Sequence, residues 1–186
     1  VPEEPPEPEP QLDDLVRQAR LSRIAALPQN IQARATQLEA QDSDLVFDRL
    51  VENKQVDERN LLRAWVATSG LKYLTRERLS ESKVPTEALD QLLAEDAEAL
   101  KVLPVALSKT DGTLTVAVEV ALPGMLDRVK MRAKSARQVV GILAMQGTVR
   151  AGIRRFYFSD SAAFNRPEPS RVPKASPAPN ESTQPA

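Results

Sequence analysis

The hydrophobic pattern of this chain changes its period once, close to Lys101, and this change constrains the fold more than any other feature. From Leu12 to about Ala99, apolar residues recur every three or four positions, which is the period of amphipathic helices. From Lys101 onward, short apolar runs with a period near two follow one another between turn signals, as β-strands do. The sequence therefore predicts an α+β protein with a helical N-terminal half and a smaller half that contains a sheet.

The N-terminal half is expected to hold five helical segments. They span about 12–27, 31–41, 45–53, 58–69 and 86–99, the last with a break near Ala94. Pro28 ends the first segment, because proline cannot continue a helix. Asp57 is a suitable N-cap for the fourth, and Gly70 is a suitable stop at its C-terminal end. Trp65 lies on the apolar face of this fourth helix and is expected to anchor the core.

The C-terminal half predicts the order β-β-α-β-α, a small α/β sandwich. Its expected elements are strands at 101–107 and 113–120, a short helix from Met125, a strand at 138–143 and a helix at 146–157. The Asp-Gly pair at 111–112 between the first two strands is typical of a hairpin turn. Ile153 and Phe156 are expected to pack on the same sheet as Ile142. Glu119 is expected to face outward or to end its strand, so that its replacement by Ala would change stability by about 0.5 kcal/mol or less.

Proline marks the two ends of the chain. Residues 1–10 contain five Pro, four Glu and one Val, and six more Pro follow Arg166. Such segments have little apolar surface to bury and are predicted to be disordered. The predicted organisation is an acidic arm at 1–11, a helical extension at 12–43, a folded domain at 44–158 and a disordered tail at 159–186.

Cysteine and histidine are absent, which excludes disulfides, thiol or imidazole catalysis and Cys/His metal sites. The paired acidic residues are explained as helix caps or exposed faces, so no catalytic residue, cofactor or metal is expected and the chain is predicted not to be an enzyme. No apolar run approaches the roughly 18–20 residues that span a bilayer, and the acidic start is unlike a secretory signal. We expect a cytoplasmic protein without membrane insertion. The start at Val1 rather than Met is what a fragment or a processed chain would show.

Charge is balanced overall but uneven along the chain. With 25 Lys or Arg and 26 Asp or Glu, no global field attracts nucleic acid or an anionic membrane. The segment 128–155, however, contains eight Lys or Arg and no acid. This segment predicts a basic, partner-binding surface, with these candidate residues: Arg128, Arg132, Arg150, Arg154 and Arg155. Because aromatic residues are not interleaved with the basic ones, a protein or acidic segment is favoured over DNA or RNA. The acidic arm is itself a candidate occupant.

Several stretches resemble the N-terminal domains of the type II secretion and type IV pilus assembly ATPases. Leu100–Val105 is similar to the "vlPv" strand of that family. Residues 126–129 resemble the start of its short helix, and residues 151–157 resemble the end of its last helix. Upstream, residues 45–64 resemble its helix-turn-helix segment. The resemblance covers about residues 44–158 and implies a domain that interacts with, or regulates, a bacterial secretion, pilus or motility apparatus.

Two departures from the family narrow what this resemblance implies. Some members bind cyclic di-GMP through an Arg-Leu-Gly start and a nearby glycine, but the matching positions here hold Leu45, Val46, Phe47 and Lys54. Cyclic di-GMP is therefore an unlikely ligand, although a dinucleotide-sensing module remains the alternative function. The ATPase motor of the family is absent as well, because its phosphate-binding sequence G-x-x-x-x-G-K-[ST] does not occur in this sequence. A weak nucleic-acid binder that uses the basic helices is the third alternative.

Overall fold

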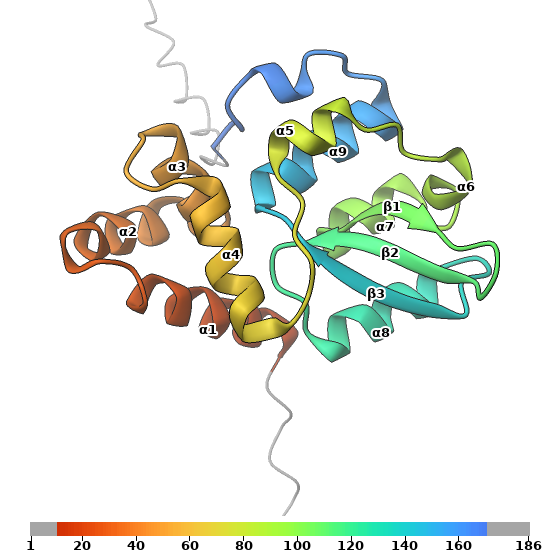
Figure 1. Ribbon diagram of the computed structural model, residues 1–186, viewed down its shortest axis with the longest axis horizontal. Coiled ribbons are helices and arrows are strands. Elements are labelled where there is room, and N and C mark those ends of the chain that lie inside the picture. Colours follow the sequence, from red (N-terminus) through yellow and green to blue (C-terminus); the bar gives the residue numbers. More distant parts are fainter. Residues whose placement is uncertain (1–10, 171–186) are drawn as a thin grey trace, which may run out of the picture.

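The structure, a computed structural model, describes residues 11–170, and its elements follow the predicted order of helices and then β-β-α-β-α. The predicted α+β fold is confirmed. The parts of the predicted tails at 1–10 and 171–186 lie outside the described residues. In Figure 1, helices α1 to α4 lie to the left, and the sheet with its covering helices lies to the right.

The first lobe is built from α1 (Leu12–Ala25), α2 (Gln29–Asp42), the 3-10 turn η1 (Ser43–Leu45), α3 (Val46–Glu52) and α4 (Glu58–Ser69). The predicted start and stop signals of α4 are confirmed. The Asp57 side chain accepts a hydrogen bond from the Asn60 amide at 3.0 Å, and Gly70 ends the helix at φ +69°. A left-handed φ at this position favours glycine, because a Cβ would meet the following carbonyl.

An apolar cluster joins all four helices of this lobe. Phe47 of α3 and Trp65 of α4 meet edge to face with their ring centroids 5.0 Å apart, and Trp65 is buried as predicted. Ile24 of α1 and Leu38 of α2 belong to the same cluster. The segment predicted as an extension at 12–43 thus shares its core with the residues that follow it.

Three short helices precede the sheet and share its apolar clusters: α5 (Arg76–Glu81), α6 (Thr86–Leu89) and α7 (Ala94–Leu100). The helix predicted from Thr86 breaks before Ala94, as expected. Helix α5 was not predicted from the sequence. The sequence feature that marks its start is Thr75, whose side chain caps the helix by accepting from the Arg78 amide at 3.3 Å. Leu79 is the buried residue of this single amphipathic turn.

The sheet contains three strands, β1 (Leu103–Leu107), β2 (Thr113–Val118) and β3 (Gln138–Leu143), in the order β1-β2-β3. Strands β1 and β2 form the predicted antiparallel hairpin, and β3 pairs with β2 in parallel. The parallel pair requires a crossover, which α8 (Pro123–Arg132) supplies. The strand β2 is thus central, and its C-terminal end points toward the first lobe.

Helices cover both faces of the sheet (Figure 1). Leu114, Val116 and Val118 face the cluster that contains Val129 of α8. Ala117, on the alternate face, contacts the cluster of α9 (Gln146–Phe158). The predicted packing of Ile153 and Phe156 with Ile142 is confirmed, because all three belong to this second cluster. Helix α9 lies so close to β1 that a Cβ at Gly152 would come within 2.4 Å of the Leu103 side chain.

The chain beyond α9 corrects one prediction. The tail predicted as disordered from residue 159 packs on the domain as far as Ser170, and we call residues 159–170 the C-terminal strap. The strap contains the 3-10 turn η2 (Ala163–Asn165), in which Ala163 is fully buried. Phe164 meets Phe156 of α9 edge to face at 6.4 Å. The proline-rich composition of this segment predicted disorder, because composition does not reveal contacts with other elements. These contacts bury the apolar surface that a disordered tail leaves exposed.

Candidate functional site

Helix α9 begins in a buried polar junction between the two lobes. The Gln146 amide donates to Glu119 Oε2 at 3.1 Å, and the Gly147 amide donates to Asp48 Oδ1 at 3.1 Å. Glu119 directly follows β2, whereas Asp48 comes from α3 of the other lobe. Two carboxyl groups thus satisfy the first amides of α9, where the helix dipole favours negative charge.

The position of Glu119 contradicts the prediction that it faces outward. Its side chain is only 2% exposed. Arg20 Nε lies 3.4 Å from Glu119 Oε1, and the Arg23 guanidinium donates to the Glu119 carbonyl at 2.8 Å. Both arginines come from α1, almost 100 residues away in sequence. Strand alternation near residue 119 carries no information about partners at that distance, and this is why the prediction failed.

Burial shifts the pKa of both junction carboxyls in the same direction. Burial raises the pKa of Asp48 well above its usual value, and the nearby Glu119 charge raises it further, against the Gly147 hydrogen bond and Arg76. Burial also raises the pKa of Glu119, although Arg20 and Arg23 oppose this shift. Asp48 Oδ2 has no hydrogen-bond partner among the described residues. Both carboxyls serve as helix caps, so this pair explains the structure of the junction without acid–base chemistry.

A second group of charges surrounds Asp44 of η1. Arg150 lies 2.8 Å from its carboxylate, Lys101 3.0 Å and Arg20 3.6 Å. Although burial opposes ionisation, the Lys101 hydrogen bond and these cations hold the pKa of Asp44 below its usual value. One carboxylate thus faces three cations. Arg20 is also paired with Glu119, so the two other cations, Lys101 and Arg150, share the one charge of Asp44.

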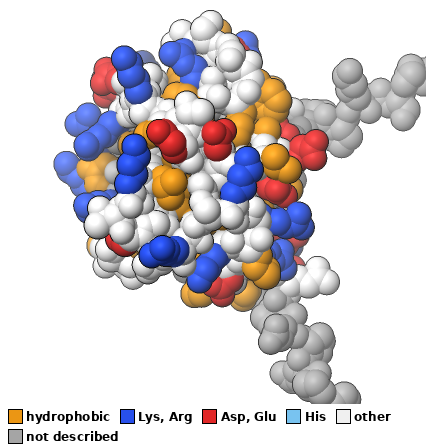
Figure 2. Space-filling model, turned by 90° about the vertical axis from the view of Figure 1, so that its right-hand side faces the viewer, with side chains coloured by type: hydrophobic (Ala, Val, Ile, Leu, Met, Phe, Trp, Pro, Cys, Tyr) orange, Lys and Arg blue, Asp and Glu red, His pale blue; other side chains and the backbone are white. Residues whose placement is uncertain are grey.

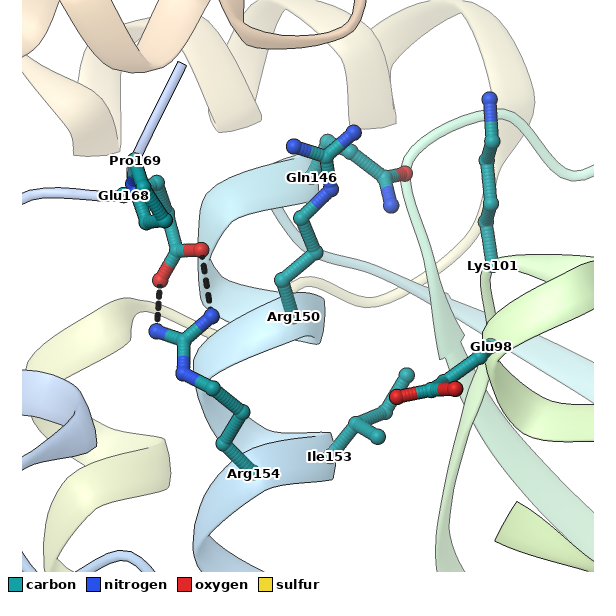
Figure 3. Close-up of a pocket in the computed structure, with 8 residues that line it drawn as sticks. All are labelled: Glu98, Lys101, Gln146, Arg150, Ile153, Arg154, Glu168 and Pro169. Carbon is teal, nitrogen blue, oxygen red and sulfur yellow. Dashed lines mark hydrogen bonds and ion pairs between the residues drawn. The ribbon is translucent and has the colours of Figure 1, made fainter. Parts of the chain in front are cut away.

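The side of α9 next to this group is hollowed into a cavity of about 280 Å³, which we call the α9 cleft (Figure 3). It is lined by Glu98, Lys101, Gln146, Arg150, Ile153, Arg154, Glu168 and Pro169. Three of these side chains are cationic. In Figure 3, the Glu98 carboxylate is turned toward Ile153, while the Lys101 ammonium extends away from it.

One end of the cleft already binds a carboxylate. Arg154 and Glu168 of the C-terminal strap form a two-pronged ion pair, with N–O distances of 2.7 and 2.5 Å (Figure 3). The Arg49 guanidinium donates to the Glu168 carbonyl at 2.6 Å. Glu168 is only 3% exposed and lies between two prolines. Paired hydrogen bonds of this kind fix both the position and the orientation of a carboxylate.

The five arginines predicted to bind a partner are divided among several places. Arg150 and Arg154 line the α9 cleft, and Arg128 of α8 lines a neighbouring cavity. Arg132 pairs with Asp96 at 3.3 Å on the surface, and Arg155 donates to the Ser161 carbonyl at 2.9 Å. On the face drawn in Figure 2, Lys and Arg side chains are interspersed with acidic and apolar ones rather than gathered in one patch. The partner-binding role of these residues stays a prediction.

Sequence reasoning did not single out several residues of this region. Asp44 and Asp48 lie on the adjacent elements η1 and α3, whereas Glu168 lies far along the chain in the strap, and the three carry no common motif. A partial signal existed for Glu168, because it is an acid directly flanked by two prolines after Arg166. Within residues 11–170, no group of acidic side chains is placed to hold a metal ion. Nor does any helix in this range have the length and apolar character needed to cross a membrane.

Solved structures that are similar to this chain include the following two. MshE with cdg is 17% identical, with a TM-score of 0.48, over 76% of this chain and 98% of that chain. The N-terminal domain of XpsE is 19% identical, with a TM-score of 0.42, over 81% of this chain and 99% of that chain. No protein-family model and no curated protein matches the chain.

Proposed function

We propose that this chain is a non-catalytic interaction or regulatory domain of a bacterial secretion, pilus or motility apparatus, and that it acts in the cytoplasm. The apparatus is proposed from the sequence resemblance over residues 44–158. The observation that supports an interaction role is the Arg154–Glu168 pair, in which the α9 cleft holds an extended, proline-flanked acidic segment. The ligand class proposed for the cleft is therefore an acidic segment of a protein partner.

The chemistry of the cleft fits recognition of such a segment. Arg154 offers the fixed, planar pair of donors that suits a carboxylate. Arg150 and Lys101 extend the cationic lining toward Asp44, whose single charge does not balance them. Ile153 provides an apolar contact for a proline or aliphatic side chain at the floor of the cleft. Extended proline-rich segments lose little entropy on binding, which favours them as ligands for a small cleft.

A retention experiment with matched variants tests this function. The purified chain is immobilised and exposed to a bacterial lysate, and the retained proteins are identified and then re-tested as purified components. Lys101→Gln with Arg154→Gln should reduce retention of an apparatus component at least roughly tenfold, since each lost ionic hydrogen bond weakens binding. Lys83→Gln with Lys130→Gln removes the same charge at two exposed residues outside the cleft and should retain the component as the wild type does.

Two results would contradict the proposal. The first is that no secretion, pilus or motility component is retained and none of the purified components binds. The second is that both double variants lose the component equally, which would indicate undirected charge attraction. If nucleic acid were the ligand instead, affinity would fall steeply with salt in proportion to the number of phosphates contacted.

Cyclic di-GMP is not expected to bind. The first three positions that correspond to the dinucleotide-binding motif hold Leu45, Val46 and Phe47, and all three side chains are buried in the core. Lys54 has a left-handed φ of 56°, the conformation that a glycine would adopt there, but its side chain occupies the position. Calorimetric titration of the full chain should show no saturable heat at tens of micromolar protein. A dissociation constant near or below about 1 μM, or −8 kcal/mol, would contradict this prediction.

A further inference from the structure

The tripeptide Pro-Glu-Pro occurs three times in this chain. One copy is Pro167-Glu168-Pro169 of the C-terminal strap, and the other two are residues 6–8 and 8–10 of the acidic arm. In the strap, the central glutamate of the tripeptide is bound by Arg154 at one end of the α9 cleft. The structure thus shows how this protein holds one copy of a sequence that it carries twice more at its other end.

The opposite end of the α9 cleft has the groups needed to bind a second carboxylate. We define this end by Lys101, Gln146 and Arg150. The Gln146 side chain extends into the space between the other two (Figure 3). Gln146 is only 4% exposed, and its side-chain Nε2 has no hydrogen-bond partner among the described residues. A buried amide donor without an acceptor is unfavourable, and a carboxylate oxygen would satisfy it.

The local charge also favours an anion there. Lys101 and Arg150 share the single carboxylate of Asp44 with Arg20. Arg20 is also paired with Glu119, so Lys101 and Arg150 against Asp44 leave one positive charge that a further carboxylate would neutralise. The Lys101 side chain remains 37% exposed and can reach an incoming group. The Glu98 carboxylate, the other acid of the cleft lining, is turned toward Ile153 in Figure 3.

The acidic arm is attached beside this end of the cleft. The cavity next to it is lined by Leu12 and Asp13 at the start of α1, by Arg128 of α8, and by the same Lys101 and Gln146. Residues 1–10 themselves lie outside the described residues. A proline-rich chain extends by about 3.1 Å per residue, so Glu9 and Glu7 can reach roughly 9 and 15 Å from Leu12. The cavity at Leu12 and the α9 cleft share Lys101 and Gln146 as lining residues. An arm of this length, attached at Leu12, can therefore reach the Lys101 end of the cleft.

We propose that a glutamate of the Pro-Glu-Pro repeat in residues 6–10 binds the Lys101–Gln146–Arg150 end of the α9 cleft, next to the strap glutamate at Arg154. Its carboxylate accepts from Gln146 Nε2 and pairs with Lys101. Because the arm is tethered, its effective concentration at the cleft is on the order of millimolar, so even a weak site is substantially occupied. This inference rests on the proposed function insofar as the cleft binds acidic segments, and it assigns the arm as an internal competitor of the partner.

Paramagnetic relaxation in the full chain tests the inference. The chain lacks cysteine, so Val1→Cys provides one site for a nitroxide label at the end of the arm. The amides of Lys101 and Arg150 should be broadened far more than those of the β1–β2 turn at 109–112. Glu7→Gln with Glu9→Gln should weaken binding by roughly tenfold, as loss of an ionic hydrogen bond does, and should remove most of this broadening.

The arm itself supplies the matched control. Glu3→Gln with Glu4→Gln removes the same two charges, but these glutamates do not lie between two prolines, and broadening should persist. Lys101→Gln should reduce broadening, whereas Lys130→Gln on α8 should not. Equal loss in both glutamate pairs, or no broadening in the wild type, overturns the inference. In either case, retention of an apparatus component by the cleft would leave the proposed function standing. If the arm binds the cleft but no apparatus component is retained, the proposed function is contradicted and the inference about the arm stands.

Discussion

Helices α8 and α9 come from one basic stretch of sequence, yet their arginines have different surroundings. On α8, the Arg132 side chain is 66% exposed and its ion pair with Asp96 is on the surface. On α9, the Arg150 side chain is only 13% exposed and binds Asp44, while Arg154 binds the buried Glu168. A run of positive charge therefore does not define a surface. The carboxylates that come from other segments decide which arginines remain available.

The two helices also begin differently. Helix α8 follows Leu122, which provides no side-chain cap, and Pro123 at its first position needs no hydrogen-bond acceptor. Helix α9 follows Met145, which likewise provides no cap, but Glu119 and Asp48 satisfy its first amides from a distance. The start of α8 is thus determined locally, whereas the start of α9 depends on tertiary structure.

The largest effect is expected from removing the carboxylate that caps α9. Glu119→Ala should lower the free energy of unfolding by about 3–5 kcal/mol, because the buried Arg20 would lose one of its two carboxylate partners and the Gln146 amide would lose its acceptor. This replaces the sequence-based expectation of a nearly silent substitution. Urea denaturation measures the effect, with Asp127→Ala on the exposed face of α8 as the control. A loss of about 1 kcal/mol or less at Glu119 would mean that α9 does not need its distant cap.

The apolar contact of α9 should be nearly as important. Ile153 is 3% exposed in the cluster between α9 and the sheet. Ile153→Ala should therefore lower the free energy of unfolding by about 2–5 kcal/mol through lost burial and a residual cavity. Met131 of α8 is 77% exposed, and Met131→Ala should change stability by about 0.5 kcal/mol or less in the same urea assay. Equal effects would show that α9 is not docked on the sheet.

A direct comparison of arginines sharpens the contrast between the helices. Arg150→Gln should destabilise the protein by about 1–3 kcal/mol, because it removes a hydrogen bond to the ionised, half-buried Asp44. Arg128→Gln on α8 makes the same chemical change at an exposed residue and should stay within about 0.5 kcal/mol. Thermal unfolding of both variants in one buffer measures the difference. A destabilisation by Arg128→Gln as large as that by Arg150→Gln would show that the Asp44 contact does not make Arg150 more important for stability than an exposed arginine.

A smaller effect should appear in the pH dependence. Because the pKa of Asp48 is raised in the folded protein above its ordinary 3.8, the folded state binds this proton more tightly than the unfolded state does. The stability from this group is fully present below pH 3.8 and is lost as pH rises through the folded pKa. Between pH 4 and 7, stability should therefore fall more steeply in the wild type than in Asp48→Asn. Parallel slopes in urea denaturation would contradict the assignment.

Much of the fold was readable from local sequence. The switch of period at Lys101 predicted the α+β class, and the Asp-Gly turn at 111–112 predicted the hairpin, because both signals act over a few residues. Helix α5 was missed because a six-residue helix shows too little of a period. The ordered strap was missed because composition near Arg166 resembles a linker, while its stability comes from Phe156 and Arg154 on another element.

The sequence by itself determined which residues are apolar, where turns and caps lie, and that no cysteine or histidine chemistry is available. Only the tertiary structure decided which charges meet. Glu119 and Asp48 meet the start of α9, Asp44 gathers Arg20, Lys101 and Arg150, and Glu168 binds Arg154. The physical reason is one of range: helix and strand preferences arise between residues a few positions apart, whereas an ion pair forms between any two charges that folding brings within a few ångströms. The α9 cleft is the product of that second kind of information.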